Sequence, residues 1–242
     1  MKSTRKMYRL ILGQRKILNS NITDRRVGAF IDKMNVTENR ILEEFRRNAE
    51  ENRVPIILRE TEGLLKSLLR LKKPAQLLEI GTAVGYSACV FADTCGCRVT
   101  SIEADEAMAD KAVRNIESLG FASHIRVLRG DGRDVLRRLH REESEVEDGK
   151  YDMVFIDAAK SHYREFWDLS LPLLKPDALI VCDNVLMKGM TASDEFDTRG
   201  RYKTSIRKMR EFLDYITGLE YAKTAVLASG YGISVSIIER NR

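Results

Sequence analysis

The sequence lacks the features that mark membrane proteins, secreted proteins and zinc-binding domains. Its 242 residues contain no apolar run near the roughly 18 to 20 residues that a membrane-spanning helix needs, and the N-terminus has no apolar signal core. The four cysteines include a C-x-C but no C-x-x-C pair, and the three histidines are scattered, which argues against a zinc site or a disulfide framework. We therefore expect a cytoplasmic protein with no membrane partner.

Two nucleotide-binding motifs are also missing. The chain has neither the G-x-G-x-x-G of dinucleotide-binding dehydrogenases nor the G-x-x-x-x-G-K-[ST] of the P-loop, and it shows no internal repeat. Its composition, 43% hydrophobic and 32% charged, is that of one α/β domain with a sizeable core.

Positive charge is in excess and unevenly placed. The net charge is +5, and residues 1–26 contain eight basic residues against the single acid Asp24. A second cluster lies near the C-terminus: Arg199, Arg201, Lys203, Arg207, Lys208 and Arg210. Such clusters suit a polyanion such as nucleic acid, although solvated helix faces are an equal alternative and the N-terminus could also be a transit peptide. We assign residues 1–36 to a basic N-terminal extension and 37–242 to the main domain.

Strand-like and helix-like segments alternate along the domain, which predicts a doubly wound, mostly parallel sheet. The predicted strands are Gln76 to Gly81, Arg98 to Ala104, Ile125 to Asp131, Tyr151 to Ala158 and Ala178 to Val185, followed by a hairpin of Thr224 to Ser229 and Gly232 to Glu239. Two helices are predicted before the sheet, at about Thr37 to Asn52 and Pro55 to Leu71, with Lys73-Pro74 as the break.

Three consecutive strand ends suit a cofactor that contains adenosine. The first runs into "EIGTAVGYS", where Gly81 and Gly85 permit a tight turn and a close backbone approach before a helix N-terminus. The second ends at Glu103, an acceptor for ribose hydroxyls, and the third ends in "GDG", which includes Asp131.

The next two strand ends suit a divalent cation. "FIDAAKSHY" places Asp157 after a buried strand with Lys160 three residues later, and the following strand ends at Asp183-Asn184. Neighbouring parallel strands end at the same edge of a sheet, so these three oxygen donors should converge on Mg²⁺ or Mn²⁺.

Taken together, "EIGTAVGYS", Glu103, "GDG", "FIDAAKSHY" and "VCDNVLMKGM" resemble the class I, metal-dependent O-methyltransferases of the catechol and caffeoyl-CoA type. The resemblance covers about residues 37 to 240 and implies a Rossmann-like sheet of seven strands with N-terminal helices. It also implies S-adenosylmethionine and Mg²⁺ (or Mn²⁺) as cofactors, with a homodimer as the assembly.

Residue roles follow from the resemblance by position. It implies that Asp157, Asp183 and Asn184 hold the metal and that Lys160 is the general base, with Asp157 beside it in the catalytic pair. It further implies S-adenosylmethionine contacts from Glu79, Gly81, Gly85, Ser87, Glu103, Asp131, Gly132 and Asp157.

The acceptor is predicted from finer similarities. "IDAAK", "DNVLMKGM", a nearby "VPI" helix start and the absence of a plant-type insertion are most similar to bacterial tRNA 5-hydroxyuridine methyltransferases. This subgroup implies methylation of 5-hydroxyuridine in the anticodon region of tRNA, giving 5-methoxyuridine. The alternative acceptor is a small catechol-like phenol. A non-enzymatic RNA-binding protein is a third hypothesis, disfavoured because Asp157, Lys160, Asp183 and Asn184 are all present.

Overall fold

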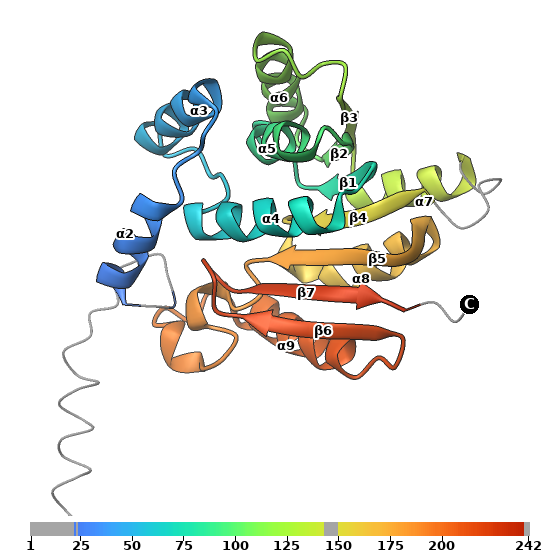
Figure 1. The fold of residues 1–242 in the computed structure, drawn as a ribbon. Coiled ribbons are helices and arrows are strands. Elements are labelled where there is room, and N and C mark those ends of the chain that lie inside the picture. The colour runs from blue at the N-terminus through green and yellow to red at the C-terminus, as the bar shows by residue number, and fades with distance from the viewer. Residues whose placement is uncertain (1–21, 23, 143–149, 240–242) are drawn as a thin grey trace, which may run out of the picture.

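A computed structural model describes residues 22, 24–142 and 150–239, which build one seven-stranded sheet (Figure 1). The strand order is β3-β2-β1-β4-β5-β7-β6; β1 to β5 are parallel, and β7 runs antiparallel to both β5 and β6. The strands are β1 Gln76–Ile80, β2 Arg98–Glu103, β3 Ile125–Arg129, β4 Tyr151–Ile156, β5 Leu174–Asp183, β6 Ala222–Leu227 and β7 Ile233–Ile238. The predicted doubly wound, Rossmann-like sheet is confirmed.

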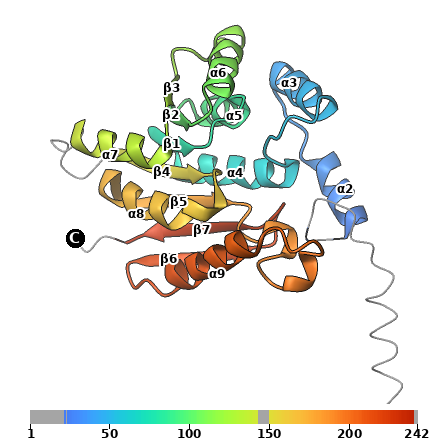
Figure 2. The same ribbon diagram turned by 180° about the vertical axis from the view of Figure 1, so that it is seen from behind.

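Helices cover both faces of this sheet (Figures 1 and 2). Side chains alternate along each buried strand: in β4, Met153 and Phe155 pack into one core, and Val154 and Ile156 into the other. The first core is closed by α4 Arg59–Lys72, α5 Tyr86–Cys95 and α6 Glu106–Ser118; the second is closed by α7 Gly132–Glu142, α8 Tyr163–Ser170 and α9 Lys203–Thr217. Burial on both faces explains why the parallel strands are continuous apolar runs.

Two helices precede α4, and both lie on the side toward which β4 and β5 point (Figure 1). They are α2 Arg25–Met34 and α3 Arg40–Glu51. Helix α2 falls inside the predicted basic extension and packs against α4, whereas residues 1–21 of that extension lie outside the described residues. The boundary at residue 36 stays a prediction.

The predicted helix start at Pro55 is wrong, because residues 54–58 are extended and α4 begins at Arg59. The Ile57 side chain is buried, and its carbonyl accepts a hydrogen bond of 2.8 Å from the buried guanidinium of Arg46. This tertiary contact holds the segment outside the helix. Strand β5 also starts earlier than predicted, at Leu174, with a left-handed residue at Asp177 (φ 58°) inside it.

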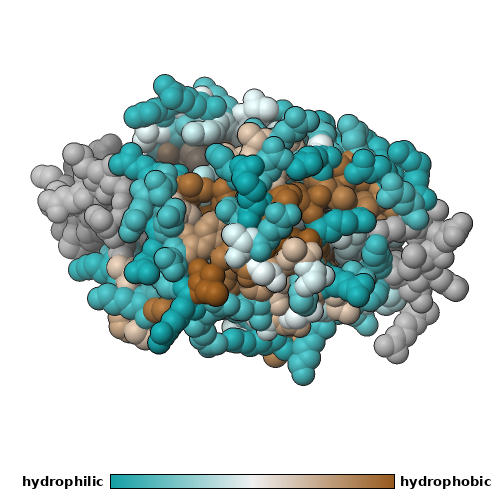
Figure 3. Space-filling model, turned by 90° about the horizontal axis from the view of Figure 1, so that it is seen from above, coloured by the Kyte–Doolittle hydropathy of each residue, from teal (hydrophilic) through white to brown (hydrophobic). Residues whose placement is uncertain are grey.

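Four short 3₁₀ turns complete the assigned elements: η1 Lys160–His162, η2 Leu171–Leu173, η3 Met187–Gly189 and η4 Asp194–Phe196. Within the described ranges, no helix is long and apolar enough to cross a bilayer. Seen from above, the surface is mostly hydrophilic, with a band of apolar residues across its middle (Figure 3).

Candidate active site

The carboxyl ends of β1, β2, β4 and β5 border a cavity of about 1470 Å³. This volume exceeds the roughly 300 to 1,000 Å³ of a pocket for one small ligand, so two ligands can lie side by side. The β1 and β4 ends touch: Asp157 N donates to Ile80 O at 2.9 Å, and a Cβ on Gly81 would collide with the Asp157 carbonyl oxygen. Gly81 has φ +106°, so only glycine fits this junction without strain.

Glu103 is fixed at the end of β2 by backbone amides. Its carboxylate accepts hydrogen bonds from Ala83 N at 2.7 Å and Asp105 N at 2.9 Å, which tie the loops after β1 and β2 together. Glu103 lines the cavity, as the sequence led us to expect for a residue that binds ribose hydroxyls. Each carboxylate oxygen keeps a second lone pair for such a contact.

Ser87 lines the cavity in the first turn of α5, and Glu79 supports it from behind. Glu79 accepts short hydrogen bonds from the hydroxyls of Ser87 and Ser101, and burial raises its pKa to about 7. Glu79 is fully buried, and neither it nor Gly85 is among the lining residues. Direct cofactor contact by these two residues therefore does not follow from the geometry; they orient the loop and Ser87 instead.

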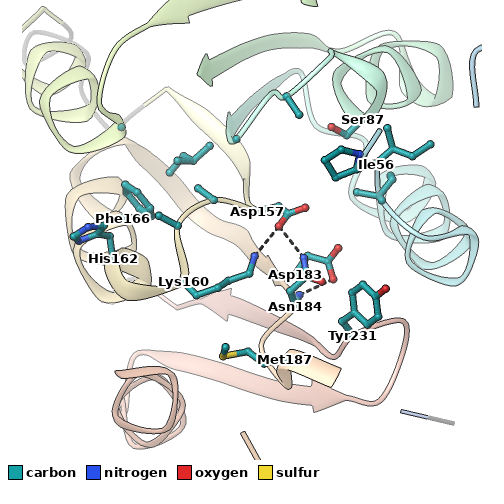
Figure 4. Close-up of a pocket in the computed structure, with 18 of the residues that line it drawn as sticks. Ile56, Ser87, Asp157, Lys160, His162, Phe166, Asp183, Asn184, Met187 and Tyr231 are labelled. Atoms are coloured by element: carbon teal, nitrogen blue, oxygen red, sulfur yellow. Dashed lines mark hydrogen bonds and ion pairs between the residues drawn. The ribbon is translucent and has the colours of Figure 1, made fainter. Parts of the chain in front are cut away.

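The end of β3 and the start of α7 form a polar edge beside an apolar slot. Asp131 lines the cavity and accepts two hydrogen bonds from the Arg133 guanidinium, which hold the pKa of the carboxyl well below its usual range. A Cβ on Gly132 would press against the Phe166 ring at 2.9 Å. Phe166 and His162 lie on the same side of the cavity (Figure 4), so this part of the wall presents aromatic rings.

Asp157, Asp183 and Asn184 converge at the centre of the cavity (Figure 4). The Asn184 side-chain amide donates to Asp157 Oδ1 at 2.8 Å, and the Asn184 backbone amide donates to Asp183 Oδ1 at 2.7 Å. The side chain of Asn184 is placed by a left-handed backbone (φ 63°), which asparagine tolerates better than most residues.

These three residues fit a hard divalent cation. Burial, together with the charge of Asp157, raises the pKa of Asp183 well above its ordinary value, so two ionised carboxylates are unfavourable here without a compensating charge. The two carboxylates, together with the Asn184 carbonyl once the amide turns its oxygen in place of its nitrogen toward Asp157, form a donor set that suits Mg²⁺ or Mn²⁺ and leaves coordination positions for other oxygens. No group of three or more His, Cys, Asp or Glu side chains that could hold a metal occurs within the described part of the chain.

Lys160 faces the same centre from η1. Its Nζ donates to Asp157 Oδ1 at 2.8 Å and to the Tyr163 hydroxyl at 2.7 Å. Tyr163 in turn donates to the carbonyl of Asp183 at 2.8 Å, so one phenol links the lysine to the next strand end. Burial and the charge of Asp157 raise the pKa of Tyr163 well above its ordinary value, which keeps this phenol neutral. Sequence analysis gave Tyr163 no role, although it closes the quoted "FIDAAKSHY".

A buried ionic network supports the cavity wall from the N-terminal helices. Arg46 of α3 donates to Glu62 of α4 at 2.6 Å and to the Tyr86 hydroxyl at 2.9 Å, and Tyr86 lines the cavity. Burial opposes ionisation of Glu62, but the charges of Arg46 and Lys66 and their hydrogen bonds outweigh it and lower the pKa to about 2. The network thus ties the N-terminal helices to the first turn of α5.

The wall beyond Asp183 and Asn184 is mainly apolar and aromatic, and sequence analysis missed it. It is contributed by residues from four separate segments: Ile56, Leu58, Met187, Met190, Phe196, Tyr202 and Tyr231. Figure 4 shows Tyr231 on the opposite side of Asp157 and Asp183 from His162 and Phe166, with Met187 below the carboxylates. The cavity therefore has two ends, and the carboxylates lie between them.

Comparison with known proteins identifies the family. The profile of the O-methyltransferase family matches residues 32–236, so the chain belongs to this family. A catechol O-methyltransferase of Niastella koreensis is 35% identical over 127 residues, which cover 52% of this chain and 56% of that protein. The chain spans about half the length of the first curated relatives it matches.

Two solved structures share the fold. A Staphylococcus aureus protein provisionally named a caffeoyl-CoA O-methyltransferase has 31% identity and a TM-score of 0.78, covering 87% of this chain and 98% of its own. The Streptomyces achromogenes O-methyltransferase TomG, solved with S-adenosylmethionine, has 23% identity and a TM-score of 0.74, covering 89% and 96%. The second similarity concerns the fold alone.

Proposed function

We propose that the protein transfers a methyl group from S-adenosylmethionine to one hydroxyl of a catechol-like phenol, with a divalent cation at Asp157, Asp183 and Asn184. The observation that carries the proposal is the arrangement of these three oxygen donors and Lys160 between the two ends of one cavity. The end with Glu103 and Asp131 suits the adenosine, and the apolar end suits an aromatic ring. Similarity to a catechol O-methyltransferase favours the same acceptor class.

Each cofactor has one chemical task. S-adenosylmethionine would supply the methyl group, and a divalent cation held by Asp157, Asp183 and Asn184 would supply Lewis acidity that makes the phenol protons easier to remove. The protein holds the acceptor and the methyl donor in line, and such orientation supplies a large part of the rate.

Lys160 is the residue placed to receive the hydroxyl proton. Its Nζ is fixed between Asp157 and the Tyr163 hydroxyl, and it borders the cavity at the carboxylates. Tyr163 stays neutral and already donates its own proton to Asp183 O, so it holds the lysine rather than replacing it.

Methylation of 5-hydroxyuridine in tRNA is the second candidate, because basic side chains remain free near the cavity mouth. Arg199, Arg201 and Lys203 are exposed, and within the described residues none of them pairs with a carboxylate. The other half of the predicted cluster is engaged: Arg207 pairs with Glu211 at 2.7 Å, and Arg210 with Asp194 at 2.8 Å. Lys208 donates to Ser161 O at 3.2 Å. The side chains of Arg199, Arg201 and Lys203 could therefore bind the phosphates of a tRNA at this edge.

A methyl-transfer assay with labelled S-adenosylmethionine and Mg²⁺ tests the proposal. We expect catechol to yield its monomethyl ether, and Lys160→Met to lower kcat by about 10² to 10⁴ fold with little change in S-adenosylmethionine affinity. The matched control is Lys175→Met, which removes a lysine that pairs with Asp152 at 3.1 Å outside the cavity. If the protein methylates tRNA containing 5-hydroxyuridine and does not turn over catechol, the proposed phenol acceptor is wrong and tRNA is the acceptor.

A further inference from the structure

The turn after the metal-binding strand holds an unusual backbone. Met187 (φ 47°), Lys188 (φ 60°) and Gly189 (φ 93°) are consecutive left-handed residues, and only the third is a glycine. Left-handed conformations at ordinary residues cost free energy and persist where the surroundings impose them, often at ligand sites. Here the result is that Lys188 lines the apolar end of the cavity.

The surroundings that impose this turn belong to the loop between β6 and β7. Val185 N donates to Gly232 O at 2.9 Å, and Leu186 N donates to Tyr231 O at 3.1 Å. Gly230 N is held by the Glu60 carboxylate at 2.8 Å, which anchors the loop to α4. The turn and the loop therefore form one rigid unit at the cavity wall.

Lys188 is held on an aromatic ring, and no acidic partner for it occurs among the described residues. Its Nζ lies 4.7 Å from the centroid of the Tyr231 ring, within range of a cation–π interaction. Across the part of the chain that the structure describes, no carboxylate forms an ion pair with it. The other lysine in the cavity wall, Lys160, is already bonded to Asp157 and Tyr163. Lys188 is thus an exposed positive charge that is positioned on a ring and, among the described residues, has no ion-pair partner.

The acidic side chains near Lys188 are either engaged by other partners or not held in place. Asp194 pairs with Arg210 at 2.8 Å, and Asp197 accepts the backbone amides of Arg201 and Tyr202. Glu195 and Lys188 both line the cavity and are exposed, but along the described ranges no hydrogen bond or ion pair fixes the Glu195 carboxylate on the short turn η4, whereas Lys188 is held on the Tyr231 ring. A group held in one place loses less entropy when it binds a ligand than a mobile one, which favours Lys188 over Glu195.

We propose that Lys188 is a specificity-determining residue that binds a carboxylate on the side chain of the acceptor, so that the preferred substrates are acidic catechols. The inference rests on the proposed function and deepens it. The two phenol oxygens lie at Asp157, Asp183 and Asn184, the ring packs on the apolar wall, and the side chain extends to Lys188. A single ammonium acts as a point charge and matches one carboxylate. Tyr231 is a positioning residue for Lys188.

The experiment compares three ligands of similar shape: dihydroxyphenylpropanoate, its uncharged amide, and dihydroxyphenylethylamine. For the unaltered protein we expect a KM about tenfold lower for the acid than for the amide, because one charge-assisted hydrogen bond to Lys188 accounts for an affinity difference of about this size. Lys188→Met should remove this preference, so that the acid and the amide have about the same KM. Lys188→Glu should shift the preference to the amine.

Two further variants separate recognition from folding. Lys188→Gly should raise the unfolding midpoint, since glycine adopts this φ without strain, yet lose the preference for the acid. Lys150→Met is the matched control, because Lys150 Nζ lies 5.7 Å from the Tyr151 ring centroid but outside the cavity wall. It should keep the tenfold preference.

Calorimetric titration of the acid and the amide in the presence of Mg²⁺ gives a reading that does not need turnover. If no catechol is methylated, the proposed function fails, while tighter binding of the acid that is lost in Lys188→Met still supports the role of Lys188. Equal binding of acid and amide, or a preference that changes in Glu195→Gln but not in Lys188→Met, overturns the inference.

Discussion

Tyr163→Phe removes one hydroxyl that connects the proposed base to the strand end carrying Asp183. The hydroxyl accepts from Lys160 Nζ at 2.7 Å and donates to Asp183 O at 2.8 Å, both at a fully buried ring. Phenylalanine leaves the Asp183 carbonyl without this donor and the Lys160 Nζ with one acceptor fewer. Loss of such a buried partner costs about 2 kcal/mol. For a domain of this size the midpoint of thermal unfolding should fall by about 4 to 8 °C.

The same substitution should slow methyl transfer by about tenfold or more, because Lys160 loses one of the two contacts that fix its amine. The affinity for S-adenosylmethionine should stay unchanged, since Tyr163 is not part of the cavity wall. The assays are thermal unfolding, kcat for catechol and calorimetry with the cofactor.

The matched control is Tyr215→Phe, which removes a hydroxyl that donates to Asp168 at 2.9 Å, and neither of these two residues is part of the cavity wall. This control should keep kcat. The reasoning is refuted if Tyr163→Phe retains both kcat and the unfolding midpoint, or if Tyr215→Phe lowers kcat equally.

Three further outcomes are expected. Gly81→Ala should abolish S-adenosylmethionine binding in calorimetry, because its Cβ would strike the Asp157 carbonyl, whereas Gly96→Ala, with φ +66° and open space, should bind normally. Mg²⁺ affinity should increase as the pH is raised from about 6 to about 8, because Asp183, whose pKa is raised, must lose its proton to bind metal; pH-independent affinity would contradict this. Glu62→Gln should lower the free energy of unfolding in urea at pH 7 by about 3 to 5 kcal/mol. Since the pKa of Glu62 is lowered to about 2, its stabilisation is present above the unfolded value near 4.5 and is lost as the pH falls toward 2, so the difference between the two proteins should shrink over that window.

The sheet and its catalytic edge were predictable because their signals are local. Apolar runs that end in Asp157 and Asp183 identify buried parallel strands, and the carboxyl ends of such strands meet at one edge. The strand order places β4 and β5 side by side, so the two carboxylates converge as the sequence indicated.

The acceptor wall could not be predicted, because its side chains come from segments without a periodic signal. Met187 follows β5, Phe196 lies on η4, and Tyr231 lies between β6 and β7. The sequence also suggested a helix from Pro55, but a hydrogen bond from Arg46, a contact between distant residues, keeps residues 55–58 extended along the cavity. The supporting role of Glu79 could not be predicted for the same reason, because its partner Ser101 lies on a different strand.

Metal removal and restoration test the central claim most directly. The purified protein is assayed with catechol and labelled S-adenosylmethionine, first in excess chelator and then after Mg²⁺ is returned, with calorimetry of cofactor binding alongside. If Asp157, Asp183 and Asn184 hold a cation that activates the acceptor, methyl transfer should stop in chelator and recover with Mg²⁺, while S-adenosylmethionine still binds. Full methyl transfer to catechol in excess chelator would contradict the account.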